Sequence, residues 1–358
     1  MKKASFLNNP YFYVVLFVAL NMAASIFYVS PNFQIAGDAL SYNESIRYLE
    51  GQTLEGPLPL HRLITTPLLL VSATVIDFIV NNPFVSLAVI NFIFYILMAL
   101  VFYQFVFEIY KDNKVALLCT ILLVSNYHIL NLDNFFIADM AGRFFFILAN
   151  LLVVKYFMSG NKKYYYSTIL VSVIGILFKE FGALGMITLG MAVLCMQYDW
   201  REKIKLILKA SVLFAIIPLL LNLFFYYKFH FSYLDWYIYS SFNHPVGAYG
   251  LSVFIKVMGW VFLVGWPLFL WGLYKEKEFF DKQRVKILGI LVPASLSFFA
   301  WPMFTYRTSF VLLPLLCLVS GFGLSKIKNK YVVALLVIFY LAVSYNLERL
   351  LVIINLPF

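Results

Sequence analysis

The stretch that most limits the possible folds is GDALSYNESIRYLEGQTLEGPLPLHR, residues 37–62. Apolar residues recur at helical spacing from Ala39 to Leu49, with polar residues between them. This pattern predicts an amphipathic helix that begins at Asp38 and is closed by Gly51. A helix of this kind lies flat on a membrane surface.

The chain around this stretch is mostly apolar. Of its 358 residues, 63% are hydrophobic and 12% are charged, and the mean hydropathy is +0.87. A soluble domain has about 45–50% apolar and about 25% charged residues. The composition therefore excludes a soluble enzyme, a disordered tail and a nucleic-acid-binding domain, and it predicts an all-α polytopic membrane protein without a separate soluble domain.

Eleven apolar runs are candidates for membrane spans, each of which needs about 20 residues. They are 10–29, 84–107, 115–131, 135–157, 164–178, 181–197, 209–229, 252–273, 285–300, 309–324 and 331–351. A further run, 64–80, is short, opens with Thr65, Thr66 and Pro67, and contains Asp77.

Positive charge decides how run 64–80 lies. If it stays at the outer surface, 19 of the 27 Lys and Arg residues fall on the side of the N-terminus, in clusters at 2–3, 111–114, 155–163, 201–209, 275–286 and 326–330. The positive-inside rule favours this arrangement and explains the net charge of +10. We therefore expect about 11 transmembrane helices, two juxtamembrane helices in the outer loop 30–83, and a cytoplasmic N-terminus.

Metal and nucleotide chemistry have little support in the sequence. The three cysteines lie in separate apolar runs, and the four histidines lack ligand spacing. There is no phosphate-binding glycine motif, and the cytoplasmic loops are short. We expect no metal site and no cofactor, although a divalent metal is not excluded.

Charged residues near the outer ends of the apolar runs are candidate site residues, because charge inside a span is costly. Asp38 is expected at the N-cap of this helix, and it could also be a general base held over the membrane, since the two roles are compatible. Asp139 and Arg143 share a helix face and form either a structural pair or the wall of a polar cavity, and Asp133 lies just outside.

Two other positions could meet a phosphate group. Lys179 and Glu180 interrupt two apolar runs, and adjacent residues do not face each other on a helix, so they are not a simple helical pair. Lys179 is either a snorkelling interfacial residue or a phosphate ligand. Arg307, next to Tyr306 at the outer start of a span, is either an interfacial anchor or a phosphate ligand.

The order and sidedness of these features resemble the GT-C superfamily of polyprenyl-phosphate-sugar-dependent membrane glycosyltransferases, and most of all its mannosyltransferase-like and aminoarabinose-transferase-like members. The motifs that carry the resemblance are GDALSYNESIRYLEG (37–51), HRLITTPLLLVSATVIDFIV (61–80), LDNFFIADMAGRFFFILANLLVV (132–154), LFKEFGALG (177–185) and YRTSFVLLP (306–314). The resemblance implies a GT-C-like transmembrane module over 1–200 and a variable one over 201–358. The outer loops depart from the family in having no Asp-Xaa-Asp or Glu-Xaa-Asp, which puts metal dependence in doubt.

The resemblance also implies an activity. A hexose or pentose would move, with inversion, from a polyprenyl-phosphate donor to a lipid, glycan or protein acceptor at the extracytoplasmic face. Asp38 would be the general base, Asp139 and Asp133 would position the acceptor or the sugar, and the donor phosphate would be bound by Arg62, Lys179 and Arg307. The further site candidates are Glu44, His61, Arg143, Glu180 and Tyr306.

Two other functions remain open at this point. A transporter or flippase of a lipid-linked or anionic substrate would also explain charges inside the membrane, but it predicts polar residues that continue into the cytoplasmic half. In this sequence they gather near the outer ends of the runs. A non-catalytic scaffold predicts that Asp38, Asp139, Lys179 and Arg307 point in unrelated directions.

Overall fold

The computed structural model describes residues 9–29, 37–53, 59–243, 251–278, 282–300, 306–347 and 349–350. All regular elements in these residues are helices, which confirms the predicted all-α class. The first part of the chain forms α1 (Pro10–Ala24), η2 (Ser25–Val29), α2 (Asp38–Leu49), α3 (Leu60–Thr65), α4 (Pro67–Val80), α5 (Pro83–Tyr110), α6 (Asn113–Val124), α7 (Tyr127–Leu130), η3 (Leu132–Phe135), α8 (Asp139–Ser159), α9 (Lys162–Phe178), η4 (Glu180–Leu184) and α10 (Gly185–Cys195). The second part forms α11 (Trp200–Phe229), α12 (Tyr233–Asn243), α13 (Leu251–Phe262), α14 (Gly265–Glu278), α15 (Lys282–Ser295), η6 (Ser297–Ala300), α16 (Tyr306–Ser309), η7 (Phe310–Leu312), α17 (Leu313–Ser325) and α18 (Lys330–Tyr345).

Several of these helices have the length and composition to cross a bilayer. The continuous helix α1–η2 and helices α5, α8 and α11 do so on their own, and α13 and α14 do so together as a pair bent by 78°. Each of the eleven apolar runs overlaps one of the helices or a consecutive pair, and the chain is a multi-pass membrane protein. The total of about 11 crossings stays a prediction.

The run 64–80 forms the end of α3 and all of α4, and its juxtamembrane position stays a prediction. Helix α4 has 14 residues and begins with Pro67. A helix of that length rises about 21 Å, which is less than the roughly 30 Å of a bilayer core.

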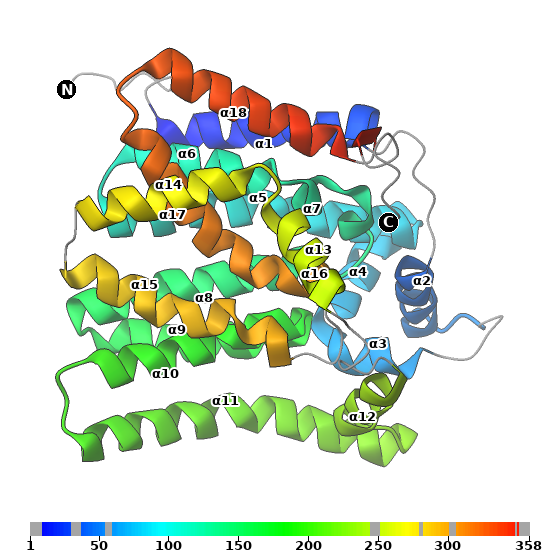
Figure 1. Ribbon diagram of the computed structural model, residues 1–358. Helices are drawn as coiled ribbons and strands as arrows, with labels where there is room; N and C mark the ends of the chain where they lie inside the picture. The colour runs from blue at the N-terminus through cyan, green and yellow to red at the C-terminus, as the bar shows by residue number, and fades with distance from the viewer. Residues whose placement is uncertain are drawn as a thin grey trace, which may run out of the picture.

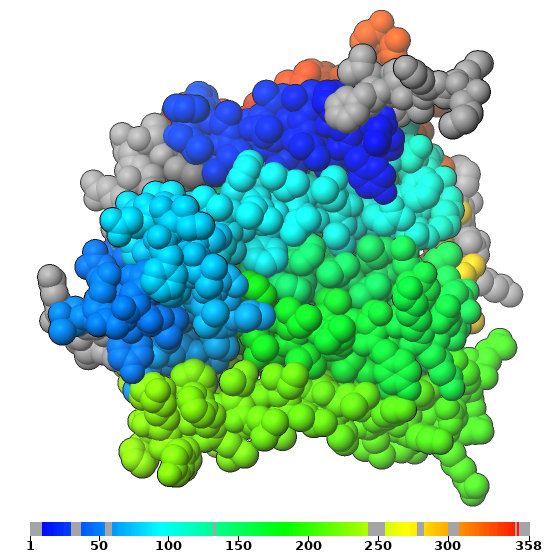
Figure 2. All heavy atoms as spheres, turned by 180° about the vertical axis from the view of Figure 1, so that it is seen from behind, coloured from blue at the N-terminus to red at the C-terminus, as the bar shows by residue number. Residues whose placement is uncertain are grey.

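The long helices lie side by side in a bundle, with α11 along one edge (Figure 1). Helices α2, α3 and α12 lie toward one end of the bundle. The ends of α8, α10 and α17, which precede basic clusters, lie at the opposite end. Seen from behind, α2, α3 and α4 form one flank of the molecule beside α5 (Figure 2). The basic clusters therefore gather at the end away from α2 and α3.

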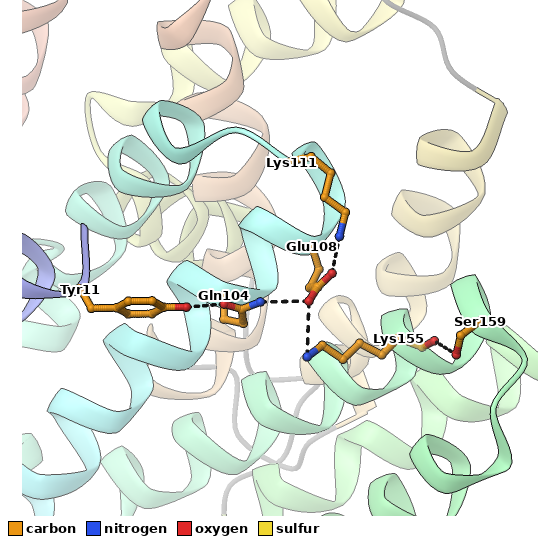
Figure 3. A network of polar contacts seen from close by, with 6 residues as sticks. All are labelled: Tyr11, Gln104, Glu108, Lys111, Lys155 and Ser159. Atoms are coloured by element: carbon orange, nitrogen blue, oxygen red, sulfur yellow. Dashed lines mark hydrogen bonds and ion pairs between the residues drawn. The ribbon is translucent and has the colours of Figure 1, made fainter. Parts of the chain in front are cut away.

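A polar network ties three helices together at this basic end (Figure 3). The Tyr11 hydroxyl of α1 donates to Gln104 Oε1 of α5, and Gln104 Nε2 donates to Glu108 Oε1 at 2.9 Å. Glu108 also pairs with Lys111 and, at 3.4 Å, with Lys155 Nζ of α8. Because each charge has an opposite charge beside it, this network fixes the relative positions of α1, α5 and α8 without exposing a lone ion to lipid.

The bend between α13 and α14 departs from the sequence prediction of one continuous span over 252–273. At the break Leu263 adopts a left-handed backbone conformation, with φ of 49°. The last carbonyls of a helix need hydrogen-bond donors from elsewhere. Asn126 Nδ2 donates to Val261 O at 3.1 Å, and His128 Nε2 lies 2.8 Å from Trp260 O. The α6–α7 turn thus supplies partners for the broken helix.

Candidate functional site

Asp38 and Arg62 form an ion pair that joins α2 to α3. Helix α2 begins at Asp38 and is closed at Gly51, as predicted. The residue at the N-cap is Gly37, whose φ of 57° suits a residue without a Cβ, and no side chain caps the helix. The expectation that Asp38 is the N-cap is therefore wrong. Its carboxylate instead faces the guanidinium of Arg62.

The guanidinium of Arg62 is held in place by an aromatic ring. Its Cζ lies 4.7 Å from the centre of the Tyr42 ring, and Arg62 is only 9% exposed. Tyr42 itself is fully buried, and its hydroxyl has no hydrogen-bond partner among the described residues. A buried hydroxyl without a partner is unusual, and at a polar site it is available to a ligand.

His61 lies next to Arg62 and is half-buried. Burial, together with the positive charges of Arg62 and Lys179, lowers the pKa of His61 from 6.5 to about 4, although Asp38 opposes the shift. The imidazole is therefore neutral near neutral pH. As a neutral ring it adds no charge to the two cations beside it.

Lys179 and Glu180 form an ion pair, with Nζ and Oε2 3.0 Å apart. This corrects the expectation from helical geometry. Lys179 has left the helix and adopts an extended backbone, with φ of −168° and ψ of 145°, so its side chain can turn back onto that of its neighbour. Glu180 is 5% exposed, and its charge reaches the hydroxyl of Tyr233 on α12, which lies beside α3.

The ammonium group of Lys179 links this ion pair to the rest of the site. It lies within electrostatic range of Tyr42, Arg62 and Asp139. Asp139 is the first residue of α8 and is 1% exposed. The stem of Lys179 packs on Gly142, one turn further along α8, where a Cβ would come within 2.7 Å of the Lys179 Cβ.

Arg143 has a different environment, although it comes directly after Gly142. It is fully buried, and its two terminal nitrogens donate to His128 O at 3.0 Å and to Asn134 Oδ1 at 3.2 Å. Its Cζ lies 4.4 Å from the centre of the Phe310 ring. Arg143 therefore joins α8 to α7, η3 and η7.

The remaining candidates are less informative. Asp133 lies in η3 and Tyr306 and Arg307 lie in α16, but their side chains are outside the described residues. Glu44 lies two residues beyond Tyr42 and so projects from the opposite side of α2. Among the described residues, no three His, Cys, Asp or Glu side chains group as a metal site requires.

The structure thus brings together Asp38, Arg62, His61, Lys179, Glu180 and Asp139, from α2, α3, α8 and the α9–η4 turn. Sequence reasoning missed three residues here: Tyr42, Gly142 and Tyr233. Tyr42 was assigned only to the apolar face of α2, and its position one turn after Asp38 was the available signal. Nothing in the sequence indicated the contacts of Gly142 and Tyr233, because both depend on how distant helices pack.

Sequence comparison finds no match to this chain, either among protein-family models or among curated proteins. Comparison with solved structures does find neighbours. ArnT from Cupriavidus metallidurans, solved with undecaprenyl phosphate bound, is 13% identical and matches with a TM-score of 0.63 over 88% of this chain and 60% of its own. The Archaeoglobus fulgidus oligosaccharyltransferase, solved with a tethered acceptor peptide, is 12% identical and matches with a TM-score of 0.52 over 94% of this chain and 53% of its own. The chain therefore spans less than two thirds of the length of either neighbour. At these identities the match shows the fold, and the chain has the fold of the GT-C superfamily of membrane glycosyltransferases.

Proposed function

We propose that the chain is a membrane glycosyltransferase that moves a sugar from a polyprenyl-phosphate donor to an acceptor hydroxyl or amide. The observation that carries the proposal is the gathering of two cations, Arg62 and Lys179, around the buried Tyr42 hydroxyl and beside the carboxylates of Asp38 and Asp139. One structural neighbour supports the donor class, since ArnT was solved with undecaprenyl phosphate.

The chemistry would be a single displacement. The acceptor oxygen or nitrogen attacks the anomeric carbon of the sugar while the bond from that carbon to the phosphate oxygen breaks. Asp38 accepts the proton of the attacking group, and polyprenyl phosphate leaves with the bonding electron pair. The configuration at the anomeric carbon inverts.

The cations would stabilise the leaving group. Negative charge grows on the phosphate as the bond breaks, and fixed cations shielded from water stabilise that charge more strongly than they would in bulk solvent. Arg62 and Lys179, with side chains 11% and 12% exposed, meet this condition. Arg307 would join them from α16, and Asp139 would orient the sugar or the acceptor.

The proposal is tested with the purified full chain in nanodiscs, by following release of polyprenyl phosphate from a panel of undecaprenyl-phosphate sugars with candidate acceptors. Asp38→Asn should lower the rate by about 1,000-fold or more, because the general base is lost, while undecaprenyl phosphate still binds. Wild-type rates in Asp38→Asn would remove Asp38 as the base. In sealed proteoliposomes, movement of the lipid-linked sugar across the bilayer without transfer would favour a transporter instead.

We also propose that this site faces the extracytoplasmic side. The support is the segregation of the basic helix ends to the opposite end of the bundle (Figure 1). In a Cys195→Ser background, a membrane-impermeant thiol reagent added outside intact cells should label Gln52→Cys, which is exposed beside α2. It should not label Asn161→Cys, exposed between α8 and α9, and the reverse pattern would place the site inside.

A further inference from the structure

Each of the two described cations at the candidate site stands beside a carboxylate of its own. Arg62 pairs with Asp38, and Lys179 pairs with Glu180. For Lys179 the arrangement is simple, because Glu180 has no proposed part in the reaction. For Arg62 it creates a conflict, since its partner is the proposed general base.

The conflict is chemical. A guanidinium within a few ångströms favours the ionised form of a carboxyl group, so a carboxylate paired with arginine is a poor proton acceptor. The same guanidinium is also the group suited to bind the donor phosphate through two parallel hydrogen bonds. Without a ligand, Asp38 and Arg62 are therefore paired with each other. In the reaction Asp38 would have to accept a proton, and Arg62 would have to bind the donor phosphate.

The two side chains differ in their freedom to move. Arg62 is confined, with a side chain 11% exposed and its guanidinium stacked on the buried Tyr42 ring. Asp38 has a side chain 39% exposed and is the first residue of α2, directly after Gly37, whose φ is 57°. If a stronger anion takes Arg62, it is Asp38 that can turn away.

We propose that Arg62 acts as a lock on Asp38, which opens when the donor phosphate takes the guanidinium and frees the carboxylate for the acceptor. This inference rests on the proposed function for the roles of the two residues, and adds to it an order of events. The donor binds first, and the base becomes effective only once a donor is present. Such an order also keeps an acceptor from being activated at an empty site.

The lock makes a prediction that a simple binding site does not, because Asp38 and the phosphate compete for Arg62. The probe is undecaprenyl phosphate, titrated into the full chain in nanodiscs and followed by native mass spectrometry. Asp38→Asn should bind it about 5- to 10-fold more tightly than the wild type, which corresponds to about 1 kcal/mol, the upper value for an ion pair at a protein surface. Arg62→Met should bind it more weakly, and Asp38→Asn combined with Arg62→Met should bind no more tightly than Arg62→Met alone.

Glu44→Gln is the matched control, because it removes one negative charge from the same helix on the side away from Tyr42. It should leave the affinity unchanged. Equal affinity in Asp38→Asn and the wild type, or equal tightening by Glu44→Gln, overturns the lock while leaving the proposed function intact. Tightening that persists without Arg62 also overturns it. Failure of every variant to bind the probe overturns the donor site itself and the lock with it.

A measurement on the unaltered protein covers the case in which Asp38→Asn does not fold. A water-soluble carbodiimide with an amine labels accessible carboxyl groups, and peptide mass spectrometry reads the position. Undecaprenyl phosphate should increase labelling of Asp38 several-fold without changing that of Glu44. Labelling of Asp38 that stays constant or falls on addition of the lipid contradicts the lock.

Discussion

The side chain of Lys179 lies directly on Gly142, where the first turn of α8 has no side chain of its own. A Cβ at position 142 would come within 2.7 Å of the Lys179 Cβ and 2.9 Å of its Cγ. Since real Cβ contacts are essentially never this close, the lysine has to move if residue 142 gains a methyl group. Because Gly142 has no side chain, Lys179 can pack against α8, and its ammonium group lies within electrostatic range of Asp139 and Arg62.

Gly142→Ala should therefore weaken the site without removing any charge from it. We expect sugar transfer to fall by about 10- to 100-fold, because a displacement of about 1 Å at a reacting site has effects of this size. Gly190→Ala on α10 is the control, since its Cβ meets nothing within 4 Å. Steady-state kinetics compares the two, and equal rates in both variants would show that Gly142 does not position Lys179.

Tyr42→Phe should separate function from folding. The Tyr42 hydroxyl is buried and has no hydrogen-bond partner among the described residues, so its removal should leave the protein as stable as before or slightly more so. If the hydroxyl binds the substrate, transfer should fall by about 10-fold, the value of one hydrogen bond to a charged group. Unchanged kinetics together with unchanged stability would exclude the hydroxyl from the site.

Arg143→Met should lower the stability of the fold. The substitution removes two hydrogen bonds that a fully buried guanidinium donates, one to His128 O and one to Asn134 Oδ1, and His128 O keeps only the one from Asn134 Nδ2 among those described. The expected loss is about 2–4 kcal/mol in the free energy of unfolding, measured by titration with a denaturing detergent. Arg201→Met, at an exposed position on α11, should lose less than about 0.5 kcal/mol.

The stability of the protein should depend on the protonation of His61. Its pKa in the folded protein is about 4, against 6.5 for an ordinary histidine, mainly because of burial. Between these values the unfolded chain takes up a proton and the folded chain does not, so stability is full above about pH 6.5 and falls as the pH drops toward 4. Thermal unfolding of the wild type and of His61→Gln between pH 7 and about pH 4.5 checks this.

The variant should lose less stability on acidification than the wild type. His230→Gln is the control, because it removes an exposed imidazole at the C-cap of α11. It should keep the response of the wild type. A wild-type slope retained in His61→Gln would mean that the imidazole is not held neutral by its surroundings.

Much of the fold could be predicted from local patterns in the sequence. The apolar runs coincide with helices because each span is long and nearly uniform, and α2 begins at Asp38 because its apolar residues keep helical spacing. Because of the same uniformity, the bend at Leu263 could not be predicted from the sequence. A run that is apolar on every side carries no periodicity from which a break could be read.

The candidate site was predicted as a set of residues, whereas its pairing was not. Asp38 and Arg62 meet because α2 packs on α3, and the spacing of two helices in sequence does not determine which side chains face each other. Lys179 and Glu180 pair because the backbone is extended at Lys179, although helical geometry predicted that they would not. Such contacts follow from tertiary packing, which one sequence without its fold does not specify.

The position of Tyr233 within electrostatic range of Glu180 has a consequence for how the protein is made. Tyr233 is anchored to the preceding span by a hydrogen bond from its backbone nitrogen to Asn222 Oδ1 at 2.7 Å, and both residues are synthesised well after Glu180. A nascent chain that has emerged only as far as α10 therefore contains the carboxylates of the site but not the helix that flanks them. Until α11 and α12 have left the ribosome and inserted, the half-made protein lies in the membrane with the Lys179–Glu180 ion pair uncovered on the side that α12 later flanks.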